Sequence, residues 1–158
     1  MIRIELKEDE ITAALASLSR ALVNKTPAMQ EIGEYMVAST QDRVGRGLTP
    51  EGTPFAPRSQ TTLAIYAAKN FSYGLPLNRS GVMRSGIFSE ADENEVTIGS
   101  NAIQSAVMQF GAAKGSLGSN SPWGNIPARP FLGISDEDRT NITDIIEEWL
   151  DLASKGGT

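Results

Sequence analysis

Residues 126–133 have the sequence Ile-Pro-Ala-Arg-Pro-Phe-Leu-Gly, and this stretch constrains the fold more strongly than any other. Pro127 and Pro130 carry no backbone N–H, and each proline disfavours a helical conformation at the residue before it. The stretch therefore excludes a helix and fits either an edge strand or an extended arm. Because it alternates a cation, Arg129, with large apolar side chains, we expect this arm to lie against another surface.

A helix is predicted directly after the arm. Ser135 is a favoured N-cap residue, and Asp138 stands at the position from which a side chain reaches back to the cap, as in a capping box. Apolar residues then recur at helical spacing as far as about Ser154, which predicts an amphipathic helix with one buried face. That face consists of Ile142, Ile145, Ile146, Trp149, Leu150 and Ala153.

The N-terminal third of the chain predicts one strand and two helices. Residues 2–6 alternate apolar and charged side chains, which is typical of a strand. A first helix is expected over residues 9–23, and a second over residues 26–44, with Pro27 in its first turn. We expect packing within the domain to cover the apolar stripes of both helices. These stripes are Ile11, Leu15, Leu18 and Leu22 in the first helix, and Met29, Ile32, Met36, Thr40 and Val44 in the second.

The middle of the chain alternates short elements with loops rich in glycine and proline. The predicted elements are a helix over residues 59–69, one or two helical turns within 78–85, strands over 86–89 and 95–99, and a helix over 102–110 that ends at Gly111. The loop over residues 111–123 holds mainly Gly, Ser, Ala and Asn, with few apolar groups. A loop of this length is usually functional or disordered, and we expect it to become ordered on binding a partner.

These elements together predict a single α+β domain over residues 1–158. We expect a small, mostly antiparallel β-sheet of about four strands, packed by the two N-terminal helices and one C-terminal helix, with long loops that project from one end. A chain of 158 residues can bury about two thirds of its unfolded surface in one domain.

Composition excludes several kinds of chemistry. The chain has no His and no Cys, so it offers no imidazole base, no thiol nucleophile and none of the usual zinc or copper ligand sets. The acidic groups at residues 92–95 and 136–138 fall in a hairpin turn and in the first turn of a helix, where carboxylates have structural roles. We therefore predict no enzymatic activity, no metal site and no cofactor.

The charge is acidic overall but unevenly spread. The net charge of −5 and the isoelectric point near 4.8 argue against a protein that wraps nucleic acid by neutralising phosphates. Residues 43–84, however, hold one acid, Glu51, among several cations. Such a stretch forms either a solvated loop region or a basic functional patch, and the sequence leaves both open. No apolar run approaches the ~20 residues that span a bilayer, so we expect synthesis in the cytoplasm and no membrane association.

Arg129 lies between two prolines, where a solvated charge has little purpose. Its planar guanidinium could pair with carboxylates of its own chain, such as those that open the last helix, or make bidentate or stacking contacts across an interface. Phe131 and Trp123 are either core residues or interface contacts, since Trp and Arg are enriched at interface centres.

Four motifs precede the arm in a fixed order. They are Gly52-Thr53-Pro54-Phe55-Ala56-Pro57, Leu77-Asn78-Arg79-Ser80-Gly81-Val82-Met83-Arg84-Ser85, Val96-Thr97-Ile98-Gly99-Ser100 and Met108-Gln109-Phe110-Gly111. With the arm and the capped last helix, they resemble the phage virion morphogenesis family, the tail completion proteins of Mu-like phages. The resemblance spans roughly residues 47–150. Where many members carry a Tyr-Ala pair and a His before Gln-Phe-Gly, this chain has Ser105-Ala106 and Met108, so roles of those side chains are not carried over.

The resemblance implies a non-enzymatic virion component that completes or terminates the tail at the head–tail junction. It implies a homo-oligomeric ring, a hexamer matching the symmetry of the tail tube. The expected partners are copies of itself, the tail tube protein and a neck or head-completion protein, while DNA passes through the lumen without sequence-specific binding. The expected location is the tail or neck of the virion, after assembly in the host cytoplasm. The residues that we expect at interfaces are Phe55, Arg79, Arg84, Trp123, Arg129, Pro130 and Phe131.

Two other classes of function remain open from the sequence. A small prophage-encoded binding or regulatory module would act on a host protein as a monomer or dimer. A carboxylate-dependent hydrolase would act on cell wall or nucleic acid. Size in solution, incorporation into particles and catalytic turnover distinguish the three classes.

Overall fold

The computed structural model describes residues 8–118 and 124–156. Its helices and strands are, in chain order, α1 (Glu8–Val23), α2 (Thr26–Arg46), α3 (Gln60–Ala68), α4 (Val82–Ser85), β1 (Ile87–Ala91), β2 (Val96–Ser100), α5 (Ser105–Phe110) and α6 (Asp136–Ser154). These elements confirm the predicted α+β class. The strand expected over residues 2–6, Trp123 and part of the loop over 111–123 lie outside the described residues.

The ends of the two longest helices follow their capping signals. α2 has proline in its first turn, and it ends at Gly47, which adopts a left-handed conformation (φ 74°) that glycine takes without steric penalty. α6 begins with the predicted capping box. The Ser135 hydroxyl accepts from the Asp138 N–H at 3.0 Å, and the Asp138 carboxylate accepts from the Ser135 N–H at 2.8 Å. Local sequence therefore fixes both helix boundaries.

β1 and β2 form an antiparallel hairpin whose register runs from Ile87 opposite Ser100 to Ala91 opposite Val96. Acids in its turn have a structural role, because the Asp92 carboxylate accepts from the N–H groups of residues 94 and 95 at 2.6 and 2.9 Å. The expectation of about four strands is wrong for the described residues, which contain two strands in one sheet. The arm over 126–133 pairs only through a single bridge to Ala112, because its prolines cannot donate to a ladder.

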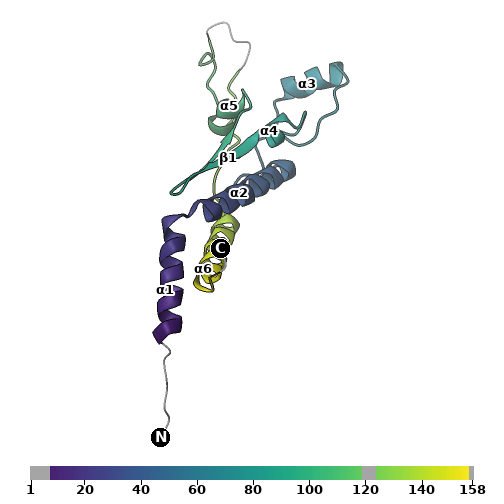
Figure 1. The fold of residues 1–158 in the computed structure, drawn as a ribbon. Coiled ribbons are helices and arrows are strands. Elements are labelled where there is room, and N and C mark those ends of the chain that lie inside the picture. The colour runs from purple at the N-terminus through teal and green to yellow at the C-terminus, as the bar shows by residue number, and fades with distance from the viewer. Residues whose placement is uncertain (1–7, 119–123, 157–158) are drawn as a thin grey trace.

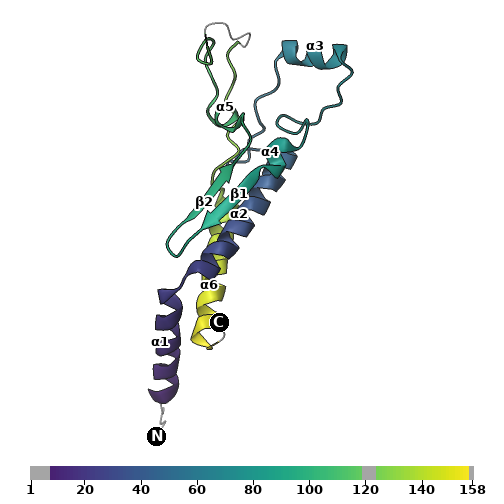
Figure 2. The same cartoon turned by 45° about the horizontal axis from the view of Figure 1, so that its top comes forward.

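α2 is the central layer of the molecule. The hairpin packs on one side of α2 and α6 packs on the other, as Figures 1 and 2 show. Gly33 allows the close approach of α2 to the sheet, since a Cβ there would lie 2.9 Å from the Ser89 Oγ. Only α2 of the two N-terminal helices packs substantially on the sheet; α1 packs on α6 instead, which corrects the expected arrangement.

The described part of the chain is elongated, with its main core between α2, the hairpin and the residue 126–133 arm. That core consists of Val44, Phe55, Met83, Ile87, Ala102 and Phe131. Two segments project from the end opposite α1 (Figure 1). We call them the α3 arm, residues 56–81, and the loop arm, residues 111–118 with 124–128. The expected projection of long loops from one end is therefore confirmed.

The apolar stripes of the outer helices are only partly covered. In α6, Ala153 is buried, but Trp149 is half-buried and Ile146 is 36% exposed, so the expectation of a fully buried face is wrong. In α1, Leu15 is 61% exposed and Leu22 is 53% exposed. The reason is that α1 and α6 extend beyond the sheet, so that α1 packs on α6, and α6 packs on α1 and α2 rather than on the sheet.

Candidate functional site

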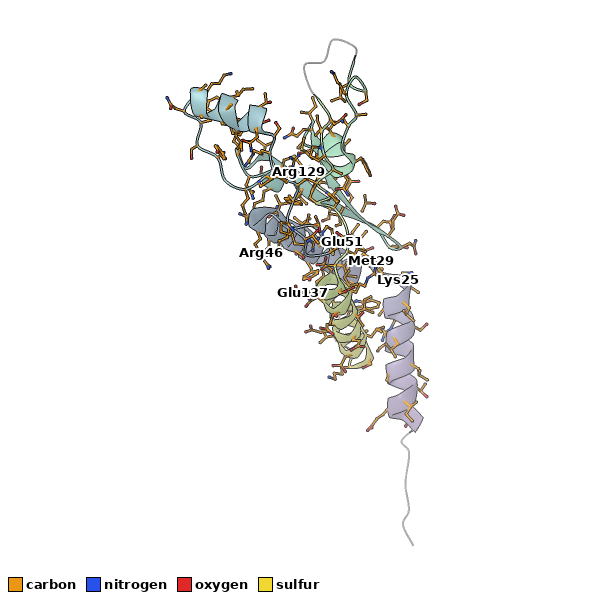
Figure 3. The ribbon with its side chains drawn as sticks, turned by 180° about the vertical axis from the view of Figure 1, so that it is seen from behind. Lys25, Met29, Arg46, Glu51, Arg129 and Glu137 are labelled. Atoms are coloured by element: carbon orange, nitrogen blue, oxygen red, sulfur yellow. The ribbon has the colours of Figure 1, made fainter. Side chains whose placement is uncertain are left out.

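Arg129 is buried at the base of the two projecting arms (Figure 3). Its Nε donates to the carbonyl oxygen of Ala56 at 2.6 Å, and its Nη2 donates to that of Pro57 at 2.7 Å. Burial, followed by the nearby charge of Arg58, lowers the pKa of Arg129. The guanidinium therefore fastens the residue 126–133 arm to the start of the α3 arm. Of the two alternatives for Arg129, pairing with the carboxylates that open α6 is not what the structure has, because its guanidinium donates to the Ala56 and Pro57 carbonyls instead. Contact of Arg129 across an interface stays a prediction.

Gln109 fastens the other side of the same arm. Its Oε1 accepts from the N–H groups of Phe131 and Leu132, each at 3.0 Å, and its Nε2 donates to the Leu132 carbonyl at 3.0 Å. The Arg129 N–H also donates to the carbonyl of Met108 at 2.6 Å. The side-chain amide of Gln109 thus makes hydrogen bonds with the arm of the kind that a neighbouring strand would make. In the sequence, Gln109 was notable only as part of the motif over residues 108–111, and its hydrogen bonds to the arm were not predicted.

The aromatic and proline residues predicted for interfaces belong mostly to the interior of the chain. Phe131 is 0% exposed and Phe55 is 5% exposed, and both lie in the main core. Pro130 is half-buried. For Phe131 the structure therefore selects the core alternative. Burial of Phe55 likewise leaves its side chain little surface for a partner.

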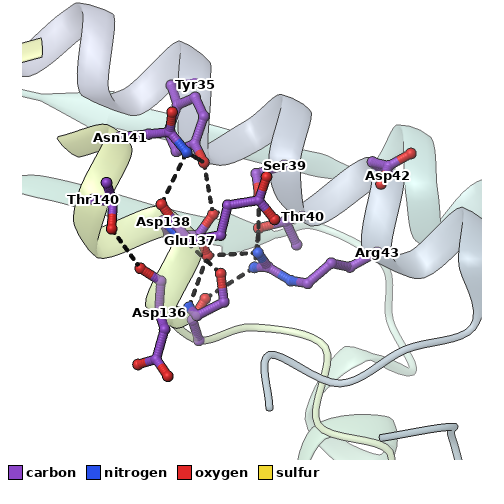
Figure 4. Close-up of polar contacts among 12 residues, drawn as sticks. Tyr35, Ser39, Thr40, Asp42, Arg43, Asp136, Glu137, Asp138, Thr140 and Asn141 are labelled. Atoms are coloured by element: carbon purple, nitrogen blue, oxygen red, sulfur yellow. Dashed lines mark hydrogen bonds and ion pairs between the residues drawn. The ribbon is translucent and has the colours of Figure 1, made fainter. Parts of the chain in front are cut away.

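A buried ion pair joins α2 to the start of α6 (Figure 4). The Arg43 Nη1 lies 2.5 Å from the Asp138 carboxylate, and its Nη2 donates to the Gly133 carbonyl at 3.0 Å. The hydroxyls of Ser39 and Tyr35 also donate to Asp138, at 2.5 and 3.1 Å. Asp138 thus caps α6 and neutralises Arg43 at once. Sequence reasoning found the cap but missed the pairing with Arg43, because nothing in helical spacing links residues so distant in the chain.

The environment of Asp138 shifts two pKa values in opposite directions. Burial opposes ionisation of Asp138, but hydrogen bonds from Ser39 and Ser135 and the charge of Arg43 outweigh it, so its pKa lies below the usual range. Burial and the hydrogen bond to Asp138 raise the pKa of Tyr35. Asp138 is therefore a carboxylate and Tyr35 a neutral donor at neutral pH. This network has the character of a structural joint rather than of a catalytic acid and base.

A cleft of about 520 Å³ opens between the α3 arm and the loop arm. Its lining is mainly apolar and includes Leu77, Met83, Val107, Met108, Leu117 and Ile126. Arg58 and Arg79 lie beside it and stack on aromatic rings: Arg58 is 5.1 Å from the Tyr73 centroid, and Arg79 is 5.3 Å from the Phe71 centroid. The cleft therefore combines an apolar wall with three arginines, the third being Arg129.

Both arms that frame this cleft are fixed at their bases. The Asn78 amide donates to the carbonyls of Val44 and Gly45 at the end of α2, at 2.5 and 3.2 Å, which anchors the return of the α3 arm. Ala112 and Ile126 exchange backbone hydrogen bonds of 2.9 and 2.8 Å at the base of the loop arm. The cleft walls are thus held by the same segments that build the core.

Of the remaining predicted interface residues, Arg79 and Arg84 are exposed, and Trp123 lies outside the described residues. Within residues 8–118 and 124–156, no cluster of three or more His, Cys, Asp or Glu could hold a metal ion. No helix in those same ranges is both long and apolar enough to cross a membrane.

Comparisons with known proteins give a consistent set of relatives. The chain is 29% identical over 156 residues to Mu-like prophage FluMu G protein 2 of Haemophilus influenzae, covering 98% of this chain and 100% of that protein. It is 29% identical over 145 residues to tail completion protein S of Escherichia phage P2, covering 91% of this chain and 95% of that protein. No solved structure matches. The sequence profile of one family covers residues 6–151, nearly the whole chain, and on that match the chain belongs to the phage virion morphogenesis family.

Proposed function

We propose that this chain is a non-enzymatic tail completion protein that forms a homo-oligomeric ring, a hexamer, at the head–tail junction of a phage particle. Family membership over residues 6–151 supports a role in virion morphogenesis. The similarity to tail completion protein S of phage P2 over 91% of the chain supports a role at the tail. In this proposal the protein is made in the host cytoplasm and ends in the tail or neck of the virion.

The observation that carries the ring proposal is the apolar surface that the chain leaves uncovered at both of its ends. At one end, α3 contains no buried residue, and Ile65 and Phe71 are 44% and 43% exposed. At the other end, α1 exposes Leu15 and Leu22. Large exposed apolar patches mark interaction sites, and two different patches on one chain favour a heterologous, head-to-tail contact. Such contacts close into a ring when the rotation between neighbours permits it.

The further partners in this proposal are the tail tube protein on one face of the ring and a neck or head-completion protein on the other. DNA would pass through the lumen without sequence-specific contacts. The net charge of −5 supports this part of the proposal, because an acidic protein is not suited to hold a polyanion by neutralising its phosphates.

A conditional stop codon in the gene of the encoding phage tests the proposal. We expect lysates without the protein to contain filled heads and separate tails, with few joined particles. Expression of the intact chain in trans should restore joining, whereas a chain truncated before α6 should not. Normal infectious particles that lack the protein would overturn the proposal and would favour a regulatory module acting on a host protein.

A further inference from the structure

The two ends of the molecule carry opposite charge. Residues 52–86 and 101–133, which include both arms, contain no Asp or Glu. Their cations are Arg58, Lys69, Arg79, Arg84, Lys114 and Arg129. The opposite end, formed by α1 and α6, is acidic. Its acids are Asp9, Glu10, Asp136, Glu137, Asp144, Glu147, Glu148 and Asp151, against Arg20, Arg139 and Lys155. Asp138 adds no charge to this end, because it is buried and paired with Arg43.

The apolar stripe of α1 is only partly covered within the described part of the chain. Ile11, Leu15 and Leu22 are 47%, 61% and 53% exposed. At 100° per residue these three side chains lie within about 40° of one another on the helix. α1 packs on α6, and its buried residue, Ala21, lies on a neighbouring face, about 80–120° from these three side chains. α1 thus packs on α6 and leaves a second, apolar face partly open.

We propose that the cleft between the two arms of one copy receives the open apolar face of α1 from the next copy. This inference rests on the proposed ring and names its contact surfaces. The cleft offers an apolar wall that includes Val107 and Leu117, and α1 offers the apolar row that would cover it. The basic arms of one copy then meet the acidic helix end of the next, so the charges favour this orientation over arm against arm.

The arginines beside the cleft fit a protein occupant better than a phosphate backbone. Arg58 already donates to the carbonyls of Gly74 and Leu75, at 2.6 Å each, and stacks on Tyr73. Arg129 is occupied by the carbonyls of Ala56 and Pro57. These guanidinium groups shape the arms and add a positive field, whereas the accessible wall of the cleft is mainly apolar.

The positions of the two surfaces suit a head-to-tail assembly. α1 and the arms lie at opposite ends of the elongated molecule in both ribbon views (Figures 1 and 2). A contact between different surfaces is heterologous, so each copy uses its cleft toward one neighbour and its α1 toward the other. Twofold pairing of α1 with α1 would leave the cleft empty and would bring two acidic ends together.

Disulfide cross-linking tests this contact directly, since the chain has no cysteine of its own. One variant carries Leu15→Cys and Leu117→Cys, which are 61% and 49% exposed in the single chain. The matched control carries Ala13→Cys and Leu117→Cys, because Ala13 is exposed on the opposite side of α1. Both are oxidised mildly, as concentrated protein and in particles assembled from the variants. We expect a ladder of cross-linked oligomers from the first variant and only background from the control.

Two further chains carry one cysteine each, either Leu15→Cys or Leu117→Cys. When the two chains are mixed and oxidised, we expect only cross-linked dimers that contain one copy of each. Leu15→Ala should weaken association about tenfold, equivalent to about 1.4 kcal/mol, while Val23→Ala, at a site 76% exposed and off the stripe, should leave association unchanged.

Four outcomes would overturn the inference. Rings or virion incorporation without the Leu15–Leu117 cross-link would do so and leave the proposed function standing. Efficient cross-linking of Leu15→Cys to itself would assign α1 to a twofold contact instead. Duplex DNA binding that is lost in Arg79→Ala, with no cross-link, would assign the cleft to nucleic acid. Absence of both rings and particle-bound protein would overturn the inference together with the proposed function.

Discussion

Replacement of Arg129 by alanine should destabilise the folded chain itself. The side chain is 7% exposed, and its guanidinium donates to the carbonyls of Ala56 and Pro57 at 2.6 and 2.7 Å. Hydrogen bonds of charged groups contribute about 1.5–3 kcal/mol each, which gives about 3–6 kcal/mol for the two bonds. Because holding the cation away from water offsets part of this gain, we expect a loss of about 3 kcal/mol.

Urea unfolding followed by tryptophan fluorescence measures this loss. With slopes of about 1–3 kcal/mol per molar for small proteins, the midpoint should fall by about 1–3 M. Arg129→Lys should fall between the native chain and Arg129→Ala, because an ammonium cannot bridge both carbonyls with a planar fork. Arg84→Ala is the matched control: this arginine is exposed, and its removal should change stability by no more than about 0.5 kcal/mol.

An Arg129→Ala chain as stable as the native one would refute this reasoning. If its tails were then abnormal in length or unable to join heads, the guanidinium would act on a neighbouring subunit rather than within its own chain. Normal infectious particles from an equally stable variant would exclude both roles.

Three further predictions concern the buried ion pair between Arg43 and Asp138, the loop arm and α6. The pKa of Asp138 is lowered in the folded chain, so its contribution to stability is present above the unfolded pKa of about 3.9 and is lost as the pH falls through the lower folded pKa. Asp138→Asn should therefore make the stability measured by urea unfolding depend less on pH in the acid range. A dependence equal to that of the native chain would contradict this. Gly111→Ala should lower the melting temperature and expose the Ala112 and Ile126 amides to hydrogen exchange, because its Cβ would lie 2.7 Å from the Ile126 carbonyl oxygen, and unchanged protection would count against it. Trp149→Ala should cost less than about 3 kcal/mol, below the range for a fully buried tryptophan, since this side chain is half-buried; a larger loss by chemical denaturation would show a tighter α1–α6 contact than the structure has.

Elements set by local chemistry were predictable from the sequence. The capping box of α6, proline in the first turn of α2 and the exclusion of helix from residues 126–133 all follow from neighbours within a few residues. The hairpin was also predictable, because its two strands flank one acidic turn.

Features set by contacts between distant segments were not predictable in the same way. Amphipathic spacing showed that α1 and α6 have apolar faces, but it could not show that both helices extend beyond the sheet and leave those faces partly open. The same limit applies to the polar anchors. For Arg129 the sequence left open a carboxylate partner in its own chain and a contact across an interface, and in the fold it donates to two carbonyls that lie more than seventy residues earlier in the chain. The hydrogen-bond partners of Arg129 depend on which atoms the fold places near its guanidinium, and residue type alone does not specify those atoms.

Cryo-electron microscopy of particles from the encoding phage tests the central claim most directly. We predict a closed ring of copies of this chain between the tail tube and the neck, with α1 of each copy seated between the arms of its neighbour. The ring should disappear from particles made without the protein and return on complementation. Particles that join heads to tails with no copy of this chain at the junction would contradict the account.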